Sequence, residues 1–134
     1  MSVTNQGLDG SIDLLQALAE VQMWESLNPS IFQTVAGRQL YFGLIRHLSR
    51  QEDKDLAIES MKEIYYDRGI NLTERGVRLT IRSFEADGVL QIEKALKDRR
   101  SRRIFLTEKL QEQMTLHALV MKKAMEKNFL VIKK

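Results

Sequence analysis

The feature that most constrains the fold is a bounded helix followed at once by two short strands. Thr73 is a typical N-cap and Gly88 a typical helix stop, so Thr73–Asp87 is predicted to be a helix. Val89–Lys94 and Arg102–Leu106 are short, β-branched and partly alternating, which indicates two paired strands. The loop between them is longer than a tight turn. A helix-turn-helix joined directly to a β-hairpin is typical of a winged helix.

Helical patterns fill the rest of the chain. Ser11–Leu27 is densely apolar and lacks helix breakers, so it predicts a helix that is buried on much of its circumference. A second helix is expected from Pro29, the only proline, to about Ser49. A third is expected over Asp55–Asp67, with Gly69 as a C-terminal glycine. The second helix carries a regular apolar stripe of six residues: Phe32, Val35, Ala36, Leu40, Leu44 and Leu48.

The predicted fold is therefore mainly α with a small β-hairpin: a winged helix-turn-helix with helices at both ends. A chain of 134 residues without a linker-like segment or an internal repeat is expected to be a single winged-helix domain, residues 1–134. Within it, residues 11–49 would form the N-terminal helices. Residues 55–106 would form the helix-turn-helix and the wing, and residues 107–130 the C-terminal helix.

The composition, 43% hydrophobic and 29% charged residues, is ordinary for a soluble globular protein. Because there is no cysteine, disulfides and thiolate metal sites are excluded, and a reducing cytoplasm is the expected location. The first ten residues are polar and carry only one charge, Asp9, unlike a signal peptide. No apolar stretch approaches the length that spans a bilayer. We therefore expect a cytoplasmic protein without a membrane partner.

No residue pattern supports enzymatic activity. The two histidines, His47 and His117, lie on different predicted helices, and each is expected to belong to a helix surface or its packing. Without cysteine or clustered His and carboxylate spacing, we expect neither a metal site nor another cofactor. Glycine-rich phosphate loops, nucleophile elbows and paired acid/base carboxylates are also absent from the sequence. The chain is not expected to be an enzyme.

Positive charge is concentrated in one segment. The net charge of the chain is only +3, but Lys94–Arg103 carries six basic residues and one acid, Asp98. That segment is therefore at +5, and the other 124 residues sum to −2. A slightly acidic body with one basic segment favours an anionic partner that meets the protein there. A solvated charged loop is the alternative interpretation of the same run.

The predicted helix Thr73–Asp87 has two different sides. At about 100° per residue, three apolar residues form one stripe toward the core: Val77, Ile81 and Phe84. The opposite side and its flank carry three arginines and one leucine: Arg75, Arg78, Arg82 and Leu79. Arginine forks reach guanine or phosphate oxygens, and an exposed leucine meets a thymine methyl group. Thr73 is placed to contact a phosphate, besides capping the helix. The alternative for the arginines is a merely solvated face.

The predicted wing loop offers several guanidinium groups to a nucleic-acid backbone or a narrow minor groove. Its candidate contact residues are Lys97, Asp98, Arg99, Arg100 and Arg102. Phosphate would repel Asp98, so this residue is expected either to pair with Arg100 and hold it in position or simply to form the turn.

The segment from Leu72 to Leu110 resembles the MarR-type winged-helix regulators. The similar motifs are LTERGV, FEADGVL, KDRRS and LTEKL. In that family the recognition helix ends in Leu-Glu-x-x-Gly-Leu-Val, the wing reads Asp-x-Arg, and the next helix starts with Leu-Thr-x-x-Gly. Here Phe84 replaces the usual leucine and Leu110 stands where the family often has glycine. The segment Asp55–Asn71 is longer than the family's compact second helix.

The resemblance implies roles for residues at matching positions. Three arginines fall where the family's recognition helix faces DNA: Arg75, Arg78 and Arg82. Asp98 and Arg100 fall on the wing's Asp-x-Arg, whose arginine enters the minor groove while the aspartate orients it.

The resemblance also implies a homodimer built from the terminal helices. The first and last helices are more apolar than a winged helix requires, and the last would extend about 33 Å. Its methionines suit an adaptable helix–helix contact: Met114, Met121 and Met125. The alternative is that both helices pack on the core of their own monomer. A cleft between the dimer base and the DNA-binding lobe is also compatible with a small-molecule effector.

The expected function is sequence-specific binding of double-stranded DNA as a dimeric transcriptional regulator. The helix at 73–87 would enter the major groove, and the wing at 95–103 would lie on the minor groove or backbone. Two alternatives stay open. One is a winged helix used for protein–protein assembly, and the other is a nucleoid or replication protein that holds DNA without sequence preference.

Overall fold

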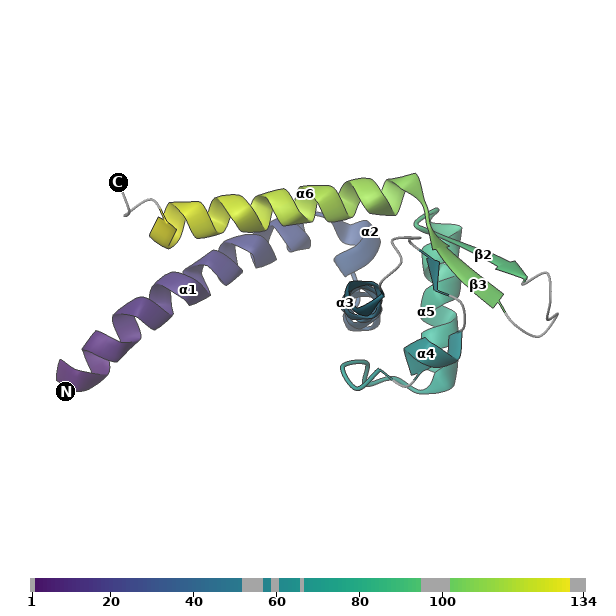
Figure 1. Cartoon of the computed structure of the whole chain (residues 1–134), viewed down its shortest axis with the longest axis horizontal. Coiled ribbons are helices and arrows are strands. Elements are labelled where there is room, and N and C mark those ends of the chain that lie inside the picture. The colour runs from purple at the N-terminus through teal and green to yellow at the C-terminus, as the bar shows by residue number, and fades with distance from the viewer. Residues whose placement is uncertain (1, 52–56, 59–60, 66, 95–101, 131–134) are drawn as a thin grey trace. The chain divides into compact units, whose positions relative to one another are not determined.

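The structure is a computed structural model that describes residues 2–51, 57–58, 61–65, 67–94 and 102–130 (Figure 1). It contains two compact units. The winged-helix unit is Ser30–Glu112, and the terminal-helix unit combines Met1–Pro29 with Gln113–Lys134. The expected fold class, mainly α with a small antiparallel sheet, is confirmed.

The second predicted helix is two helices, α2 (Pro29–Phe32) and α3 (Val35–Arg50), so the prediction of one continuous helix was wrong. Thr34 has an extended backbone, and its side chain accepts a hydrogen bond from the Gly37 N–H at 2.9 Å. Gly37 is needed at this join because a Cβ there would lie 2.7 Å from the Ile31 carbonyl oxygen. A cap and a close backbone approach, rather than a proline, therefore interrupt the helix.

The apolar stripe predicted for this region is only partly buried. Leu40 and Leu44 lie in the core, but Val35 is 74% exposed. The stripe assumed an unbroken helical period, and that period restarts at α3 because Thr34 caps a new helix.

The third predicted helix, Asp55–Asp67, is only partly correct over its described residues. The helix α4 covers Met61–Tyr65, but a short strand, β1 (Ala57–Ile58), lies near the predicted start. β1 pairs with Phe105 and Ile104 of the hairpin, and Ile58 is completely buried. Pairing with the sheet satisfies the backbone of β1, so this tertiary contact overrides the local helical pattern.

The predicted C-terminal glycine of that helix was also wrong. α4 ends at Tyr65, and the backbone of Gly69 is not left-handed. Among the described glycines, Gly88 has the positive φ, +77°, that a helix stop of this kind uses.

The helix and the hairpin from which the fold was inferred are present. α5 covers Glu74–Ala86, β2 Leu90–Lys94 and β3 Arg102–Leu106. The strands form an antiparallel sheet in the order β1-β3-β2, with Leu90 opposite Leu106 and Ile92 opposite Ile104. α3 packs against α5, and α5 packs against β2 (Figure 1). This arrangement fixes the orientation of α5 within the winged-helix unit.

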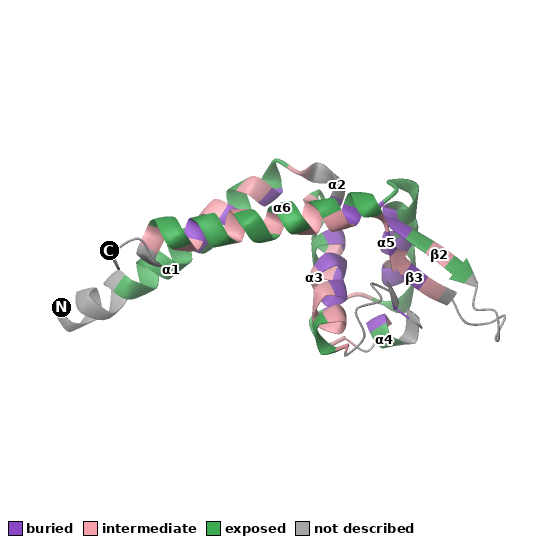
Figure 2. Ribbon diagram, turned by 45° about the horizontal axis from the view of Figure 1, so that its top comes forward, coloured by how far each residue is buried: buried purple, intermediate pink, exposed green. Residues whose placement is uncertain are grey.

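The terminal-helix unit contains α1 (Ser2–Ser26), most of α6 (Glu108–Met125) and a π-helical turn, Glu126–Leu130. Its small core joins Ala17 and Val21 to Ala124. The prediction that the first helix is buried on much of its circumference was wrong for this single chain (Figure 2). Eight large apolar side chains of this unit are exposed: Ile12, Leu14, Leu15, Leu18, Met23, Leu27, Leu116 and Leu119.

A buried polar contact also joins the two long helices within the terminal-helix unit. His117 Nε2 lies 3.1 Å from a carboxylate oxygen of Glu25, and its ring stacks on Trp24 at 5.2 Å. Glu25 is only 5% exposed. His117 therefore takes part in helix packing, as the sequence indicated. None of the described helices is long and apolar enough to cross a membrane.

Candidate nucleic-acid interface

The two sides of α5 differ as its sequence pattern predicts. Three apolar side chains of the helix are at most 3% exposed and face the core: Val77, Ile81 and Phe84. The residues chosen as candidate DNA contacts on this helix are all exposed: Thr73, Arg75, Arg78, Leu79 and Arg82. Leu79 is 52% exposed and is the large apolar side chain on this otherwise polar side of the helix. The winged-helix unit thus presents arginines around one apolar side chain; contact with DNA stays a prediction.

Thr73 determines where α5 begins. Its backbone is extended, and its hydroxyl oxygen accepts a hydrogen bond from the Gly76 N–H at 3.0 Å. In the next turn, the Thr80 hydroxyl donates a hydrogen bond to the Gly76 carbonyl at 2.8 Å. The N-cap role is therefore present. The Thr73 hydroxyl keeps its own hydrogen as a donor for a phosphate oxygen.

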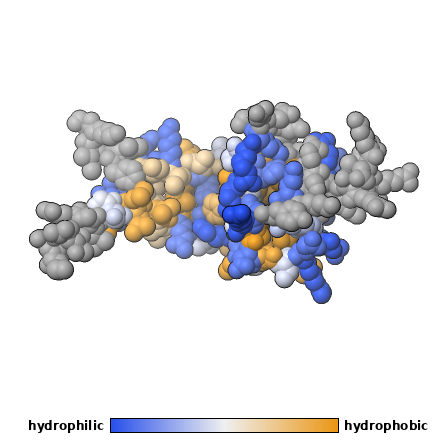
Figure 3. Space-filling view, turned by 60° about the horizontal axis from the view of Figure 1, so that its bottom comes forward, coloured by the Kyte–Doolittle hydropathy of each residue, from blue (hydrophilic) through white to orange (hydrophobic). Residues whose placement is uncertain are grey.

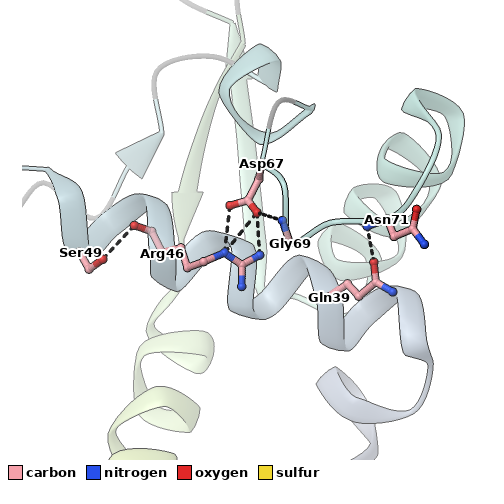
Figure 4. A network of polar contacts seen from close by, with 6 residues as sticks. All are labelled: Gln39, Arg46, Ser49, Asp67, Gly69 and Asn71. Atoms are coloured by element: carbon pink, nitrogen blue, oxygen red, sulfur yellow. Dashed lines mark hydrogen bonds and ion pairs between the residues drawn. The ribbon is translucent and has the colours of Figure 1, made fainter.

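An ion pair anchors the segment that leads into α5 (Figure 4). Arg46 of α3 donates to Asp67 from both Nε and Nη2, the shortest distance being 2.7 Å. The same carboxylate accepts the Gly69 N–H at 2.7 Å. A side chain at Gly69 would overlap the Arg46 guanidinium, which explains a glycine without a left-handed backbone. Nearer to the start of α5, Gln39 of α3 accepts the Asn71 N–H at 2.7 Å.

These contacts keep Asp67 charged. Burial of the carboxyl group would raise the pKa of Asp67, but hydrogen bonds from Arg46 and the Gly69 N–H outweigh it, so the pKa is lowered. The side chain of Asp67 is 4% exposed. The side chain of Arg46 is 40% exposed, so a partly buried, charge-assisted contact holds the turn before α5.

The far end of α5 is held by α6 and the residue before it. The hydroxyl of Thr107 donates to the Gly88 carbonyl at 2.7 Å, and Lys109 Nζ donates to the Asp87 carbonyl at 2.8 Å. A lysine at the last carbonyls of a helix satisfies acceptors that have no partner inside the helix and favours the helix dipole. Both ends of α5 are thus fixed by neighbouring elements.

Arg78, the arginine on the flank of α5, makes two side-chain contacts. Arg78 Nε donates to the Tyr65 hydroxyl of α4 at 3.2 Å, and Nη2 lies 3.6 Å from a Glu74 carboxylate oxygen. The hydrogen bond with Tyr65 raises the pKa of Arg78 above its ordinary value. The four-residue spacing of Glu74 and Arg78 is a sequence signal for the ion pair. Tyr65 carries no such signal, because its contact depends on how α4 packs.

The wing is only partly described. The strands β2 and β3 are present, and near their loop end the Arg103 guanidinium lies over the Phe105 ring at 4.8 Å. Four predicted wing contacts fall outside the described residues: Lys97, Asp98, Arg99 and Arg100. The backbone of Arg102 belongs to β3, and its side chain likewise lies outside what the structure describes.

The residues that the structure describes were also compared with the requirements of a metal site. In that part of the chain, no three His, Asp or Glu side chains lie together in a way that could hold an ion. His47 lies instead beside Glu63 of α4, with 3.3 Å between its Nε2 and the carboxylate, and so connects α4 to α3.

Solved structures share this arrangement. Transcriptional regulator PA4135 superposes with a TM-score of 0.52 at 24% identity, over 89% of this chain and 82% of that one. Sco3205, a MarR family transcriptional regulator from Streptomyces coelicolor solved in complex with DNA, gives a TM-score of 0.51 at 17% identity, over 90% and 77%. The chain has the fold of a MarR-type winged helix. No protein-family model matches the sequence, and no curated protein is significantly similar to it.

Proposed function

We propose that this chain binds double-stranded DNA with sequence specificity and acts as a transcriptional regulator. The supporting observation is the exposed side of α5, where Arg75, Leu79 and Arg82 lie opposite the buried stripe of a winged helix. The major groove is wide enough for a helix, and the second helix of a helix-turn-helix is the one that enters it. The chain would act by binding, without catalysis and without a cofactor.

Each exposed residue of α5 has a proposed role. Arg75 and Arg82 would form forked hydrogen bonds with guanine or contact phosphate oxygens, and Leu79 would meet a thymine methyl group. Thr73 would contact a phosphate from the start of the helix, where backbone N–H groups also favour an anion. Arg78 would contact DNA from the flank of the same surface.

The wing would supply a second set of contacts. Its basic residues would lie along the DNA backbone or in the minor groove: Lys97, Arg99, Arg100 and Arg102. Asp98 would orient Arg100 there. These roles rest on the sequence and on the resemblance.

The proposed regulator is a cytoplasmic homodimer. The support for self-association is the exposed apolar surface of the terminal-helix unit, since the largest such patch on a monomer usually has a function (orange at the left of Figure 3). Two recognition helices in successive major grooves would lie about 34 Å apart on a palindromic site. A small-molecule effector stays a prediction without an assigned site.

A selection of bound duplexes from a random DNA pool tests the proposal directly, because it reports sequence preference and half-site spacing together. The selected duplex is then titrated at several salt concentrations against the wild-type chain and against R75A and R82A. Each of these two substitutions should reduce discrimination against mismatched sites by on the order of tenfold, the value of one good arginine–base contact. K123A, which removes one exposed positive charge from the terminal-helix unit, is the matched control.

The titration also separates the alternatives. If the wild-type chain binds no duplex even at low salt, DNA binding of either kind is wrong. The exposed apolar surface of the terminal-helix unit then favours the alternative of a winged helix used for protein–protein assembly. Binding that does not discriminate between sequences would support a nucleoid or replication protein instead.

A further inference from the structure

Arg78 differs from the other exposed arginines of α5 in being held from two sides. The Tyr65 hydroxyl on α4 accepts a hydrogen bond from Nε at 3.2 Å, and a Glu74 carboxylate oxygen lies 3.6 Å from Nη2. The side chain of Arg78 is nevertheless 57% exposed. A partner can therefore reach a guanidinium whose position is already set.

The contact with Tyr65 is the one that fixes this position. An exposed ion pair four residues apart on a helix contributes little by itself. Tyr65 belongs to a different helix and is only partly exposed, so its hydroxyl holds Nε from outside α5. A long side chain that is ordered before binding loses less rotamer entropy on binding, which favours a contact that requires one geometry.

The contact with Glu74 determines which kind of DNA group Arg78 suits. The carboxylate of Glu74 is 65% exposed and compensates the arginine charge, so the pair as a whole gains little from a phosphate. Beside a base edge, a carboxylate accepts a hydrogen bond from the cytosine N4 amino group, and an arginine fork reads guanine O6 and N7. With Nε bound to Tyr65, both Nη groups still point away from the side-chain stem and can form that fork.

We propose that Tyr65 and Glu74 make Arg78 a base-reading residue: Tyr65 positions the guanidinium, and Glu74 suppresses its use as a phosphate contact. This inference rests on the proposed binding of α5 to DNA. It adds to that proposal two residues, and it assigns Arg78 to sequence discrimination rather than to general affinity.

The role of Glu74 is tested with E74Q against E85Q. Both variants remove one exposed carboxylate from α5, but Glu85 lies near the other end of the helix. Affinities are measured for the duplex selected from the random pool and for an unrelated duplex. E74Q should raise affinity for unrelated DNA about threefold more than affinity for the selected duplex, and so lower the selected-to-unrelated ratio about threefold. E85Q should leave that ratio unchanged.

The role of Tyr65 is tested with a double-mutant cycle of Y65F and R78A. Y65F alone should weaken binding to the selected duplex about three- to tenfold, the effect of one ordinary hydrogen bond, and leave unrelated DNA unaffected. In the R78A background, Y65F should cause no further loss, because the group that it positions is gone. Thermal unfolding of each variant shows that the chains compared are folded.

The outcomes separate this inference from the proposed function. It is overturned if Y65F weakens binding equally with and without Arg78, since Tyr65 then acts through the structure alone. It is also overturned if E74Q changes the ratio no more than E85Q does. A wild-type chain that selects no duplex would instead contradict the proposed function, and this inference with it.

Discussion

Arg46 and Asp67 form a partly buried ion pair in front of the helix that carries the candidate interface. The carboxylate takes hydrogen bonds from two nitrogen atoms of Arg46 and from the backbone of Gly69. Removal of the Asp67 carboxylate would leave the Gly69 N–H and the partly exposed Arg46 without this acceptor, which destabilises the folded state. The contact therefore couples the stability of the turn to the position of α5.

The lowered pKa of Asp67 predicts a specific pH dependence of stability. A carboxyl whose pKa is lower in the folded state contributes fully above its unfolded pKa, and the contribution is lost as the pH falls through the folded value. The free energy of unfolding should thus decline from about pH 4 downward. D67N should lower this free energy by about 1–3 kcal/mol at pH 7 and by much less at about pH 2–3.

Urea unfolding of both chains at the two pH values measures the difference. Many carboxylates contribute to acid unfolding, so the informative quantity is the gap between D67N and wild type. D13N, which removes an exposed carboxylate from α1, is the control. A gap that is equally large at both pH values would contradict the role assigned to the Asp67 charge.

At the level of elements, α5 was predicted correctly from local signals at its two ends. Thr73 and Gly88 bound α5 as the sequence indicates, because the N-cap and the left-handed glycine act within a few residues. β1 and the break before α3 could not be predicted in this way. β1 exists because its backbone pairs with β3, and the break depends on the close approach of Gly37 to the Ile31 carbonyl.

The same distinction applies to the candidate site. The exposed side of α5 follows from helical periodicity, so the sequence alone identifies Arg75, Leu79 and Arg82. The contact between Tyr65 and Arg78 joins residues from two helices. The sequence predicted one helix over Asp55–Asp67, and this prediction did not place Tyr65 beside α5. The contact between Tyr65 and Arg78 was therefore missed.

The N-cap of α5 gives a test at this scale. T73V removes the hydroxyl that accepts the Gly76 N–H, so the free energy of unfolding should fall by about 1 kcal/mol, whereas T73S should retain most of it. Urea unfolding of the three chains measures the effect. DNA affinity under conditions where all are folded then reports whether the hydroxyl also contacts a phosphate. Equal stability of T73V and wild type would contradict the capping role.

At the level of the whole molecule, apolar side chains are exposed mainly on one unit. The exposed leucines of α1 and α6 belong to the terminal-helix unit, whereas the exposed side of α5 is polar around Leu79. Under the proposed function, this division would separate a surface for self-association from a surface for nucleic acid. A second copy would then cover the apolar side chains of the first helix that the single chain leaves exposed.

Substitution of Leu18 tests this division. Leu18 is 48% exposed on α1, so an aspartate there costs little in the monomer but would bury a charge in a helix–helix interface. We expect L18D to shift the chain from dimer to monomer in sedimentation-velocity experiments at micromolar concentration. Because one recognition helix then engages one half-site, affinity for a palindromic duplex should fall by at least on the order of a hundredfold, while a single half-site is bound as before. L79D is the matched control, with Leu79 at 52% exposed, and should remain a dimer but lose sequence preference. If L18D and wild type sediment alike as monomers, the terminal helices are not the dimer interface, and the exposed leucines need another partner.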